Sequence, residues 1–354
     1  MLKVVSLFSG AGGSDLGILG DFKFLNKNYS RLPYEVVFAN DFDAKAVETY
    51  NANFVHKATL GSIIDLHDQV PAHDILIGGF PCQSFSTVNP NKDPYDDRAQ
   101  LYKEMARILK EKQPMAFIGE NVKGLVVLKK GEIFKRILQE FGDAGYDITY
   151  KVINTADYGV PQKRQRVFIV GIRKDLGLNF TFPNATHSEL GIDGTKKWTP
   201  LKKIIDSLVP EDPKYYFSDK AVQGMKNAKN NMKRGLAQDL SGPSLTVTSH
   251  LAKVSLNSRD PVLLVDPKNE KYRRFTPLEA ARIQSFPDNF EWIGSEAAAY
   301  KQIGNAIAPV AMWHISKKLA ETLELATAKQ AIANSVEQGS MLEQMGLDYK
   351  PLAA

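Results

Sequence analysis

The first 175 residues alternate short apolar runs with segments in which apolar positions recur at helical spacing. The apolar runs predict buried strands at residues 3–9, 35–41, 74–79, 115–121, 148–154 and 166–172. Helical patterns lie between them at residues 43–54, 101–112 and 133–145. Strands that alternate with helices in this way predict an α/β domain with a doubly wound, mainly parallel sheet.

The regular alternation stops at about residue 178, where a turn-rich stretch and then a lysine-rich stretch begin. Isolated strands are predicted beyond this point at residues 244–249 and 260–265, and helices at 277–286 and 311–330. The last of these helices would suit packing back on the sheet. The pattern therefore predicts a second, smaller and less regular domain, and residues beyond about 330 show no recognisable chemistry.

Composition excludes several classes of protein. Hydrophobic residues make up 43% of the chain and charged residues 24%, as in ordinary soluble globular proteins. One cysteine cannot form an intramolecular disulfide, and with only six histidines besides we expect no metal site. No apolar run approaches the roughly 18 residues of a membrane span. We therefore expect a cytoplasmic protein without a membrane partner.

The positive charge is unevenly distributed. Residues 196–234 hold ten Lys or Arg and four acidic residues, whereas the whole chain has a net charge of only +5. A basic segment on a near-neutral body indicates a polyanionic partner. A solvated, lysine-rich surface would give the same pattern, and charge alone does not separate the two.

Residues 4–17 read as a strand, a glycine-rich turn and the start of a helix. Ligands bind at such strand ends in doubly wound sheets, and glycines let them approach the backbone. Asp15 stands where the third glycine of a dinucleotide fingerprint would be, which favours a different adenosine ligand. Asp41, at the end of the second strand, could take ribose hydroxyls, and Phe42 could stack on adenine. A purely structural turn is equally compatible with this stretch.

The lone cysteine, Cys82, follows a predicted strand and Pro81. Buried cysteines are usually inert, whereas a nucleophile needs exposure and a helper group. The next predicted strand ends near Glu120, and parallel strands bring their carboxyl ends to one edge of the sheet. We therefore expect Glu120 near Cys82, beside the adenosine ligand.

Six motifs now stand in order along the chain. They are FSGAGG (8–13), GGFPCQSFS (78–86), ENVKG (120–124), QKRQR (162–166), RRFTPLEAARIQSFPD (273–288) and QIGNAIAP (302–309). The set resembles the bacterial DNA (cytosine-5)-methyltransferases of restriction–modification systems over nearly all of residues 3–320. The resemblance implies a Rossmann-like, S-adenosylmethionine-dependent domain. It implies a catalytic domain at 1–177, a target-recognition domain at 178–285, a return segment at 286–328 and a tail of unknown role at 329–354.

The resemblance also implies a mechanism. Cys82 would add to C6 of a cytosine flipped out of duplex DNA, so that C5 can accept a methyl group. Glu120 would contact N3 and the exocyclic amine. Arg164 and Arg166, which point to one side of an extended segment, would contact O2 and a nearby phosphate. Residues 83–101 would form the loop that closes over the base.

The cofactor residues that the resemblance implies are drawn from several motifs. They are Phe8, Ser9, Gly10, Gly12, Gly13, Asp41, Phe42, Ser62, Ile63, Pro81, Leu101, Asn305 and Ala306. Ser62 stands where the family usually has aspartate, which would weaken a hydrogen bond to the adenine amine. Ala99 stands where the family's loop usually has glycine, which could alter loop closure.

The partner is expected to be double-stranded DNA, acted on by a monomer, with a restriction endonuclease linked functionally. Ser84, Thr246, Arg259 and Arg274 are the residues predicted to contact DNA. Three alternatives carry weight: an RNA-acting enzyme of the same chemistry, an NAD-dependent oxidoreductase, and a DNA-binding regulator with a dead site. Ala116–Ile118, where the RNA branch usually has Cys-Phe-Thr, argues against the first. The broken glycine spacing argues against the second, and the intact motifs against the third.

Overall fold

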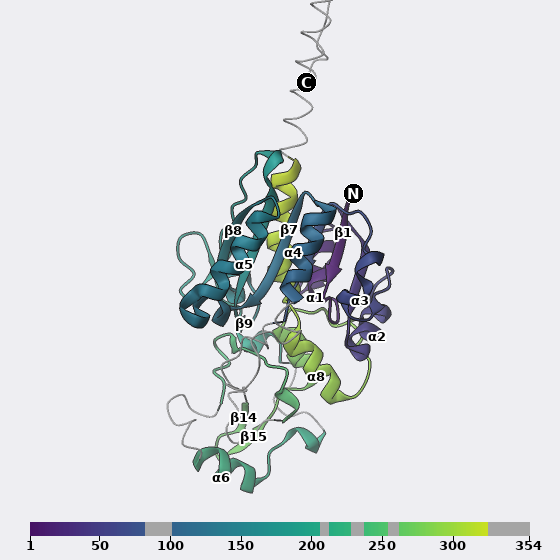
Figure 1. The fold of residues 1–354 in the computed structure, drawn as a ribbon. Helices are drawn as coiled ribbons and strands as arrows, with labels where there is room; N and C mark the ends of the chain where they lie inside the picture. The colour runs from purple at the N-terminus through teal and green to yellow at the C-terminus, as the bar shows by residue number, and fades with distance from the viewer. Residues whose placement is uncertain (82–100, 206–211, 228–236, 254–261, 325–354) are drawn as a thin grey trace, which may run out of the picture.

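The computed structural model describes residues 1–81, 101–205, 212–227, 237–253 and 262–324. Its centre is a seven-stranded sheet with a smaller, irregular part below it (Figure 1). None of the described helices has the length and apolar character needed to cross a membrane.

The sheet has the strand order β5-β4-β1-β6-β7-β10-β8. These strands are, in that order, Thr59–Leu60, Tyr34–Asp41, Leu2–Leu7, Ile75–Gly78, Ala116–Val122, Gln165–Arg173 and Tyr146–Asn154. β10 runs antiparallel to both β7 and β8, and the other pairings are parallel. All six predicted strands are present, so the prediction of a mainly parallel α/β sheet is confirmed.

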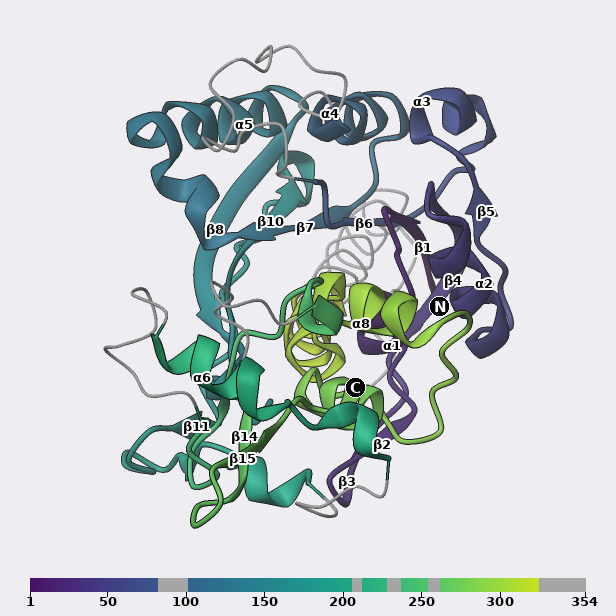
Figure 2. The same cartoon turned by 90° about the horizontal axis from the view of Figure 1, so that it is seen from below.

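Helices cover both faces of the sheet (Figure 2). One face carries α3 (Ile63–Leu66), α4 (Leu101–Lys112) and α5 (Glu132–Asp143). The other carries α1 (Gly13–Leu19) and a helical stretch over residues 309–324, whose apolar side chains join those of β1, β4 and β7 in one core. The predicted packing of this last helix on the sheet is therefore confirmed. α2 (Ala44–Asn53) lies beside β4 and is capped by Asp43, whose side chain accepts from two backbone N–H groups.

The smaller part is built from short pieces. β9 (Gln162–Lys163) pairs with β13 (Ser244–Leu245), β11 (His187–Ser188) with β12 (Lys196–Lys197), and β14 (Leu263–Asp266) with β15 (Lys271–Arg273), while α6 spans Asp219–Asn227. The strand predicted at 244–249 is only two residues long. Beyond Leu245, side chains bond Val247 in place of a strand ladder: its N–H donates to Gln162 Oε1 and its carbonyl accepts from Arg164.

A third apolar cluster joins this part to the rest of the chain. It gathers side chains from α7 (Pro277–Ile283), α8 (Glu296–Asn305) and the segment around Val247. Before α7, the fully buried guanidinium of Arg273 forms a two-bond ion pair with Glu279, with both distances 2.8 Å. A hairpin of β2 (Phe22–Phe24) and β3 (Lys27–Tyr29) packs on the α1 side and was not predicted.

Candidate active site

Glu120 lies near the carboxyl end of β7, and its side chain is only 13% exposed. Arg166, on the neighbouring strand β10, places Nε 3.1 Å from Glu120 Oε1. Burial raises the pKa of Glu120 above its ordinary value, although Arg166 and Arg164 act in the opposite direction. Glu120 therefore keeps its proton to higher pH than an exposed glutamate, which suits an acid that must donate a hydrogen bond.

The backbone leading to the cysteine is held against the same edge. β6 and β7 pair in parallel, with Gly78 opposite Gly119. The buried Asn121 side chain donates to the carbonyl of Phe80 at 2.8 Å. A Cβ at Gly79 would lie 3.5 Å from Glu120 Oε2, so the chain passes directly beside the carboxyl group. The expectation that this turn and Glu120 share one sheet edge thus agrees with the geometry.

Arg164 has a different environment from Arg166. It is 3% exposed, and its guanidinium donates to the carbonyls of Val247 (3.0 Å), Gly304 (3.0 Å) and Ala306 (3.3 Å). Both terminal nitrogens are occupied, and only Nε is without a partner among the described residues. The structure therefore supports a positioning role for Arg164 in place of the predicted contact with the base.

Two glutamines that sequence reasoning did not single out complete this junction. Gln162 donates to Gln284 Oε1 at 2.7 Å and accepts from the N–H of Val247 at 2.8 Å. Gln284 in turn donates to the carbonyls of Ile303 and Ala306. Gln162 lies in the motif QKRQR and Gln284 in RIQSF, so membership of a motif was the sequence feature that could have identified them. The network fixes the segment around Val247 against the catalytic sheet.

The glycine turn and the end of β4 meet at Asp41. Gly10 N–H donates to Asp41 Oδ2, and Asp43 N–H donates to Oδ1, both at 2.8 Å. Burial raises the pKa of Asp41, while these backbone bonds lower it. Gly10 has φ +56° and faces open space, and Phe42 is 70% exposed. Each oxygen of Asp41 can still accept a second hydrogen bond, so these residues fit a ribose and a stacked aromatic ring.

The other residues predicted to bind the cofactor surround this turn. Ser9 Oγ donates to the carbonyl of Asn40, and Phe8, with φ 55°, packs against the sheet core. A Cβ at Gly12 would lie 2.3 Å from the Phe54 ring, and one at Gly13 would lie 2.3 Å from the carbonyl of Ile307. These glycines thus allow the turn to contact Phe54 and the backbone directly after Asn305 and Ala306, which end α8.

Ser62 and its neighbours form a second group. Ser62 Oγ accepts from the N–H of Ile64 at 3.3 Å and caps α3, and Ile63 is buried. The serine oxygen is therefore already used by the backbone. Leu101 is the first residue of α4, and Pro81 ends the described segment before it.

Asp15 is a further residue that sequence reasoning did not assign a role. It is fully buried and accepts from Ser6 Oγ (2.9 Å), Ser14 Oγ (3.0 Å) and Tyr50 OH (2.9 Å). Burial raises its pKa to about 6. The residue that breaks the dinucleotide spacing thus ties the glycine turn to β1 and α2.

Several predicted residues cannot be placed. Cys82, Ser84, Ala99 and Arg259 lie outside the described residues, as does the predicted loop apart from Leu101. Two of the predicted DNA contacts are described. Thr246 Oγ1 donates to the carbonyl of Lys163, and Arg274 pairs with Glu296 at 3.3 Å and with the carbonyl of Ala252. No metal-binding group of His, Cys, Asp or Glu occurs in the described part of the chain.

Comparison with known proteins identifies the family. The sequence matches the C-5 cytosine-specific DNA methylase family over residues 2–321. The chain belongs to this family. The type II methyltransferase M.FnuDI of Fusobacterium nucleatum is 33% identical over 374 residues, covering 97% of this chain and 100% of the relative. M1.ScrFI of Lactococcus lactis subsp. cremoris is 35% identical over 329 residues, covering 91% and 79%.

Solved structures agree with this methylase in fold. The DNMT2 mutant of Spodoptera frugiperda has a TM-score of 0.68 at 20% identity and covers 92% of this chain and 100% of its own. S. pombe Dnmt2 has a TM-score of 0.65 at 20% identity, with 92% and 99% covered. The protein is thus a DNA cytosine-5 methyltransferase with the predicted α/β architecture.

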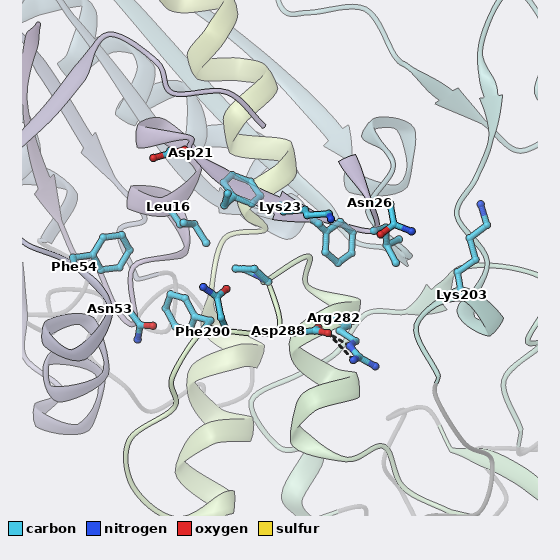
Figure 3. A pocket seen from close by; sticks show the side chains of 15 residues that line it. Leu16, Asp21, Lys23, Asn26, Asn53, Phe54, Lys203, Arg282, Asp288 and Phe290 are labelled. Atoms are coloured by element: carbon cyan, nitrogen blue, oxygen red, sulfur yellow. Dashed lines mark hydrogen bonds and ion pairs between the residues drawn. The ribbon is translucent and has the colours of Figure 1, made fainter. Parts of the chain in front are cut away.

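A large cavity of the methylase lies away from these groups. It measures about 790 Å³ and lies between the β2–β3 hairpin, α1 and the loop after α7 (Figure 3). Phe54 and Phe290 line it, and the ion pair of Arg282 and Asp288, at 2.7 Å, stands at one side. None of the residues predicted to bind cofactor or substrate is among its described lining, so it is separate from the catalytic edge.

Proposed function

We propose that this methylase transfers the methyl group of S-adenosylmethionine to C5 of a flipped-out cytosine in a specific duplex DNA sequence. The observation that carries the proposal is the buried carboxyl of Glu120, held by Arg166 beside the backbone that leads to Cys82. An acid and a thiol at one sheet edge are what attack on a pyrimidine ring requires.

Cytosine C5 is a weak nucleophile, and the two side chains overcome this together. The thiolate of Cys82 forms a bond to C6, and the ring electrons move toward N3. Protonated Glu120 donates to N3 and neutralises the charge that develops there. The ring is then an enamine, and C5 can attack the methyl group of S-adenosylmethionine, whose S–CH3 bond breaks so that S-adenosylhomocysteine would leave as the thioether. Loss of the C5 proton to water afterwards expels Cys82 as the thiolate, the N3 proton returns to Glu120, and the aromatic ring is restored.

The cofactor fits the residues around the glycine turn. S-adenosylmethionine supplies the electrophilic methyl group when it is bound. Asp41 would accept from the ribose hydroxyls, since each of its oxygens keeps a free lone pair. Phe42 would stack on the adenine, and the open backbone at Gly10 would admit the methionine part. We propose no metal in this reaction.

The remaining roles follow from the substrate. The target carbon is stacked inside the duplex, so the base must be flipped out before Glu120 can reach it. Residues 178–285 would recognise the sequence, with Thr246, Arg259 and Arg274 as contacts and Ser84 near the flipped base. Since the relatives are type II methyltransferases, we propose a role in protecting host DNA from a cognate endonuclease. We further propose that the methylase acts as a monomer.

The test is transfer of labelled methyl from S-adenosylmethionine to mixed-sequence duplex DNA, with Cys82→Ala alongside. The parent should label DNA, and the variant should bind cofactor and DNA without labelling. A duplex with 5-fluorocytosine at the mapped site should trap a covalent adduct, because no C5 proton can leave. Labelling of RNA but not DNA, or equal labelling by Cys82→Ala, would contradict the proposal.

A further inference from the structure

A group of basic side chains lies apart from the catalytic edge, and the proposed reaction does not use it. Three segments far apart in the sequence build it: the β2–β3 hairpin, the β11–β12 pair and the helical stretch at residues 309–324. We call it the Lys27 cluster, and its members are Lys27, His187, Lys196, His314 and Lys317.

The Lys27 cluster lies beyond the end of α1 that is remote from the cofactor turn. Trp313 Nε1 donates to the carbonyl of Ser30 at 2.9 Å, and a Cβ at Gly20 would lie 3.2 Å from the same nitrogen. Gly20 caps the C-terminal end of α1, whereas the glycine turn precedes Gly13 at the other end. Seven helical residues separate these ends by about 10 Å. The cluster is therefore distinct from the proposed cofactor and base sites.

Two buried aromatic rings hold the lysines of the cluster close together. Lys27 Nζ lies 4.7 Å from the centre of the Tyr29 ring and 6.0 Å from that of Trp313. Lys317 Nζ lies 5.8 Å from the centre of the same Trp313 ring. The two rings meet edge to face with their centres 5.2 Å apart. They attract both ammonium groups without accepting hydrogen bonds as an oxygen would, so the N–H donors stay available.

Acidic side chains do not balance this positive charge. Lys27 and Lys196 form no ion pair with an acid in the part of the chain that the structure describes. Lys317 lies 3.4 Å from Glu321, but both side chains are about half exposed, so water screens the pair. The cluster thus carries positive charge that an anion could neutralise.

The charges act on one another, which shows that they surround one place. Burial, followed by the charges of Lys196 and Lys317, lowers the pKa of Lys27. Burial also lowers the pKa of His187 and brings that of His314 to about 4, and the charge of Lys27 adds to both shifts. A duplex presents its phosphates along an extended path. A compact group of cations therefore suits a short, densely charged anion better than a duplex.

Positive charge continues from the cluster to the rim of the cavity in Figure 3. Lys203 lines this cavity, and its charge acts on His187 together with burial and the nearer cations. Lys23 and Asn26 also line it, and Asn26 directly precedes Lys27 in the hairpin. The cavity thus offers room beside the cluster for the uncharged part of a larger ligand.

We infer that the Lys27 cluster binds a compact oligophosphate, either an inorganic anion or the phosphate chain of a nucleotide. Lys27 and Lys317 would donate to the phosphate oxygens, and His187 and Lys196 would complete the site from the β11–β12 pair. An oligophosphate carries several negative charges on adjacent groups, which matches several cations around one place. The inference goes beyond the proposed function and does not depend on it.

The test is calorimetric titration of the full chain with inorganic tripolyphosphate at a constant ionic strength of about 0.1 M. The parent should bind one anion per chain, and Lys27→Gln and Lys317→Gln should each weaken binding about tenfold. The matched control is Lys110→Gln, because Lys110 is an exposed lysine in the last turn of α4, on the other face of the sheet. Its affinity should equal that of the parent, and thermal unfolding should show that all variants are folded.

A second titration with GTP distinguishes the two sources of the phosphate chain. Guanine differs from the adenine of the proposed cofactor, so binding at the cofactor site does not confuse the result. Tighter binding of GTP than of tripolyphosphate, weakened by Lys27→Gln, would identify a nucleotide as the ligand. Equal or weaker binding of GTP would identify the inorganic anion.

Three results would overturn the inference. They are the absence of saturable binding by the parent, equal binding by the parent and both cluster variants, and an equal loss in Lys110→Gln, which would reflect net charge alone. Displacement of tripolyphosphate by a short duplex would also overturn it, because the anion would then occupy the DNA site. Methyl transfer measured without the anion should be the same for Lys27→Gln and the parent. If the parent binds tripolyphosphate through Lys27 but transfers no methyl group, the inference stands and the proposed function fails.

Discussion

Gly304→Ala should loosen the junction between α8 and the proposed recognition segment. A Cβ at Gly304 would lie 2.2 Å from the carbonyl carbon of Thr248 and 2.3 Å from the N of Ser249. Ordinary contacts begin at 3.4 Å, so the two backbones must separate by about 1 Å. Backbone atoms cannot rotate aside as a side chain can, so we expect an overpacking cost of about 3 kcal/mol. Alanine's better helix propensity returns about 1 kcal/mol, which leaves a loss of about 2 kcal/mol.

Separating the two backbones should also affect function, because Arg164 donates hydrogen bonds to the carbonyls of both Gly304 and Val247. We expect a lower unfolding midpoint and weaker DNA binding. The control is Gly142→Ala in α5, where a Cβ would meet nothing within 4 Å. That variant should gain about 0.5–1 kcal/mol. If thermal unfolding shows Gly304→Ala to be as stable as Gly142→Ala, the close approach at α8 is not real.

Three further predictions concern charged side chains. Methyl transfer should fall as pH rises through the raised pKa of Glu120, because the reaction needs the protonated acid. Glu120→Gln should lose about 10²–10⁴-fold in kcat, and its rate should not fall in this way at high pH. A decrease at high pH that persists in the variant would have to come from another group. Asp15 has its pKa raised from 3.8 to about 6, so stability present below pH 4 should be lost as pH rises to about 6. The free energy of unfolding should fall by about 3 kcal/mol over this pH range. Urea unfolding of Asp15→Asn should show no such dependence of stability on pH. Glu279→Gln should destabilise the protein by about 3–5 kcal/mol, because the buried guanidinium of Arg273 loses the carboxylate charge that pairs with it, and a much smaller loss in urea unfolding would contradict this.

Local periodicity predicted the regular elements well. The apolar face of α4, with Tyr102, Met105, Ile108 and Leu109 buried, repeats every three or four residues, and its predicted bounds agree with the structure. Five of the six predicted strands contain a buried apolar run between turn residues. The prediction of a buried strand at residues 148–154 was wrong in burial, because most side chains of β8 are half-buried or exposed at the edge of the sheet. The β2–β3 hairpin was missed because its strands are only three residues long, too short for the alternation in β2 to stand out.

The sequence motifs predicted which residues belong to the candidate site, but not which residues they contact. Glu120 and Arg166 meet because β7 and β10 are neighbours in the sheet, a pairing that only the structure shows. The partners of Arg164 could not be predicted, since its acceptors lie 83, 140 and 142 residues away and are backbone carbonyls that leave no trace in sequence. The cap made by Ser62 was likewise hidden, because a serine hydroxyl suits either a helix start or a ligand.

The helical stretch at residues 309–324 has a consequence for how the protein is made. Its side chains cover β1 and β4, which leave the ribosome long before it does. Translation proceeds at about 5–20 residues per second, so this face of the sheet stays uncovered for on the order of tens of seconds before residues 309–324 are made. During this interval an apolar surface is open to solvent and to other nascent chains. Correct maturation therefore includes a late step in which residues 309–324 complete the sheet face.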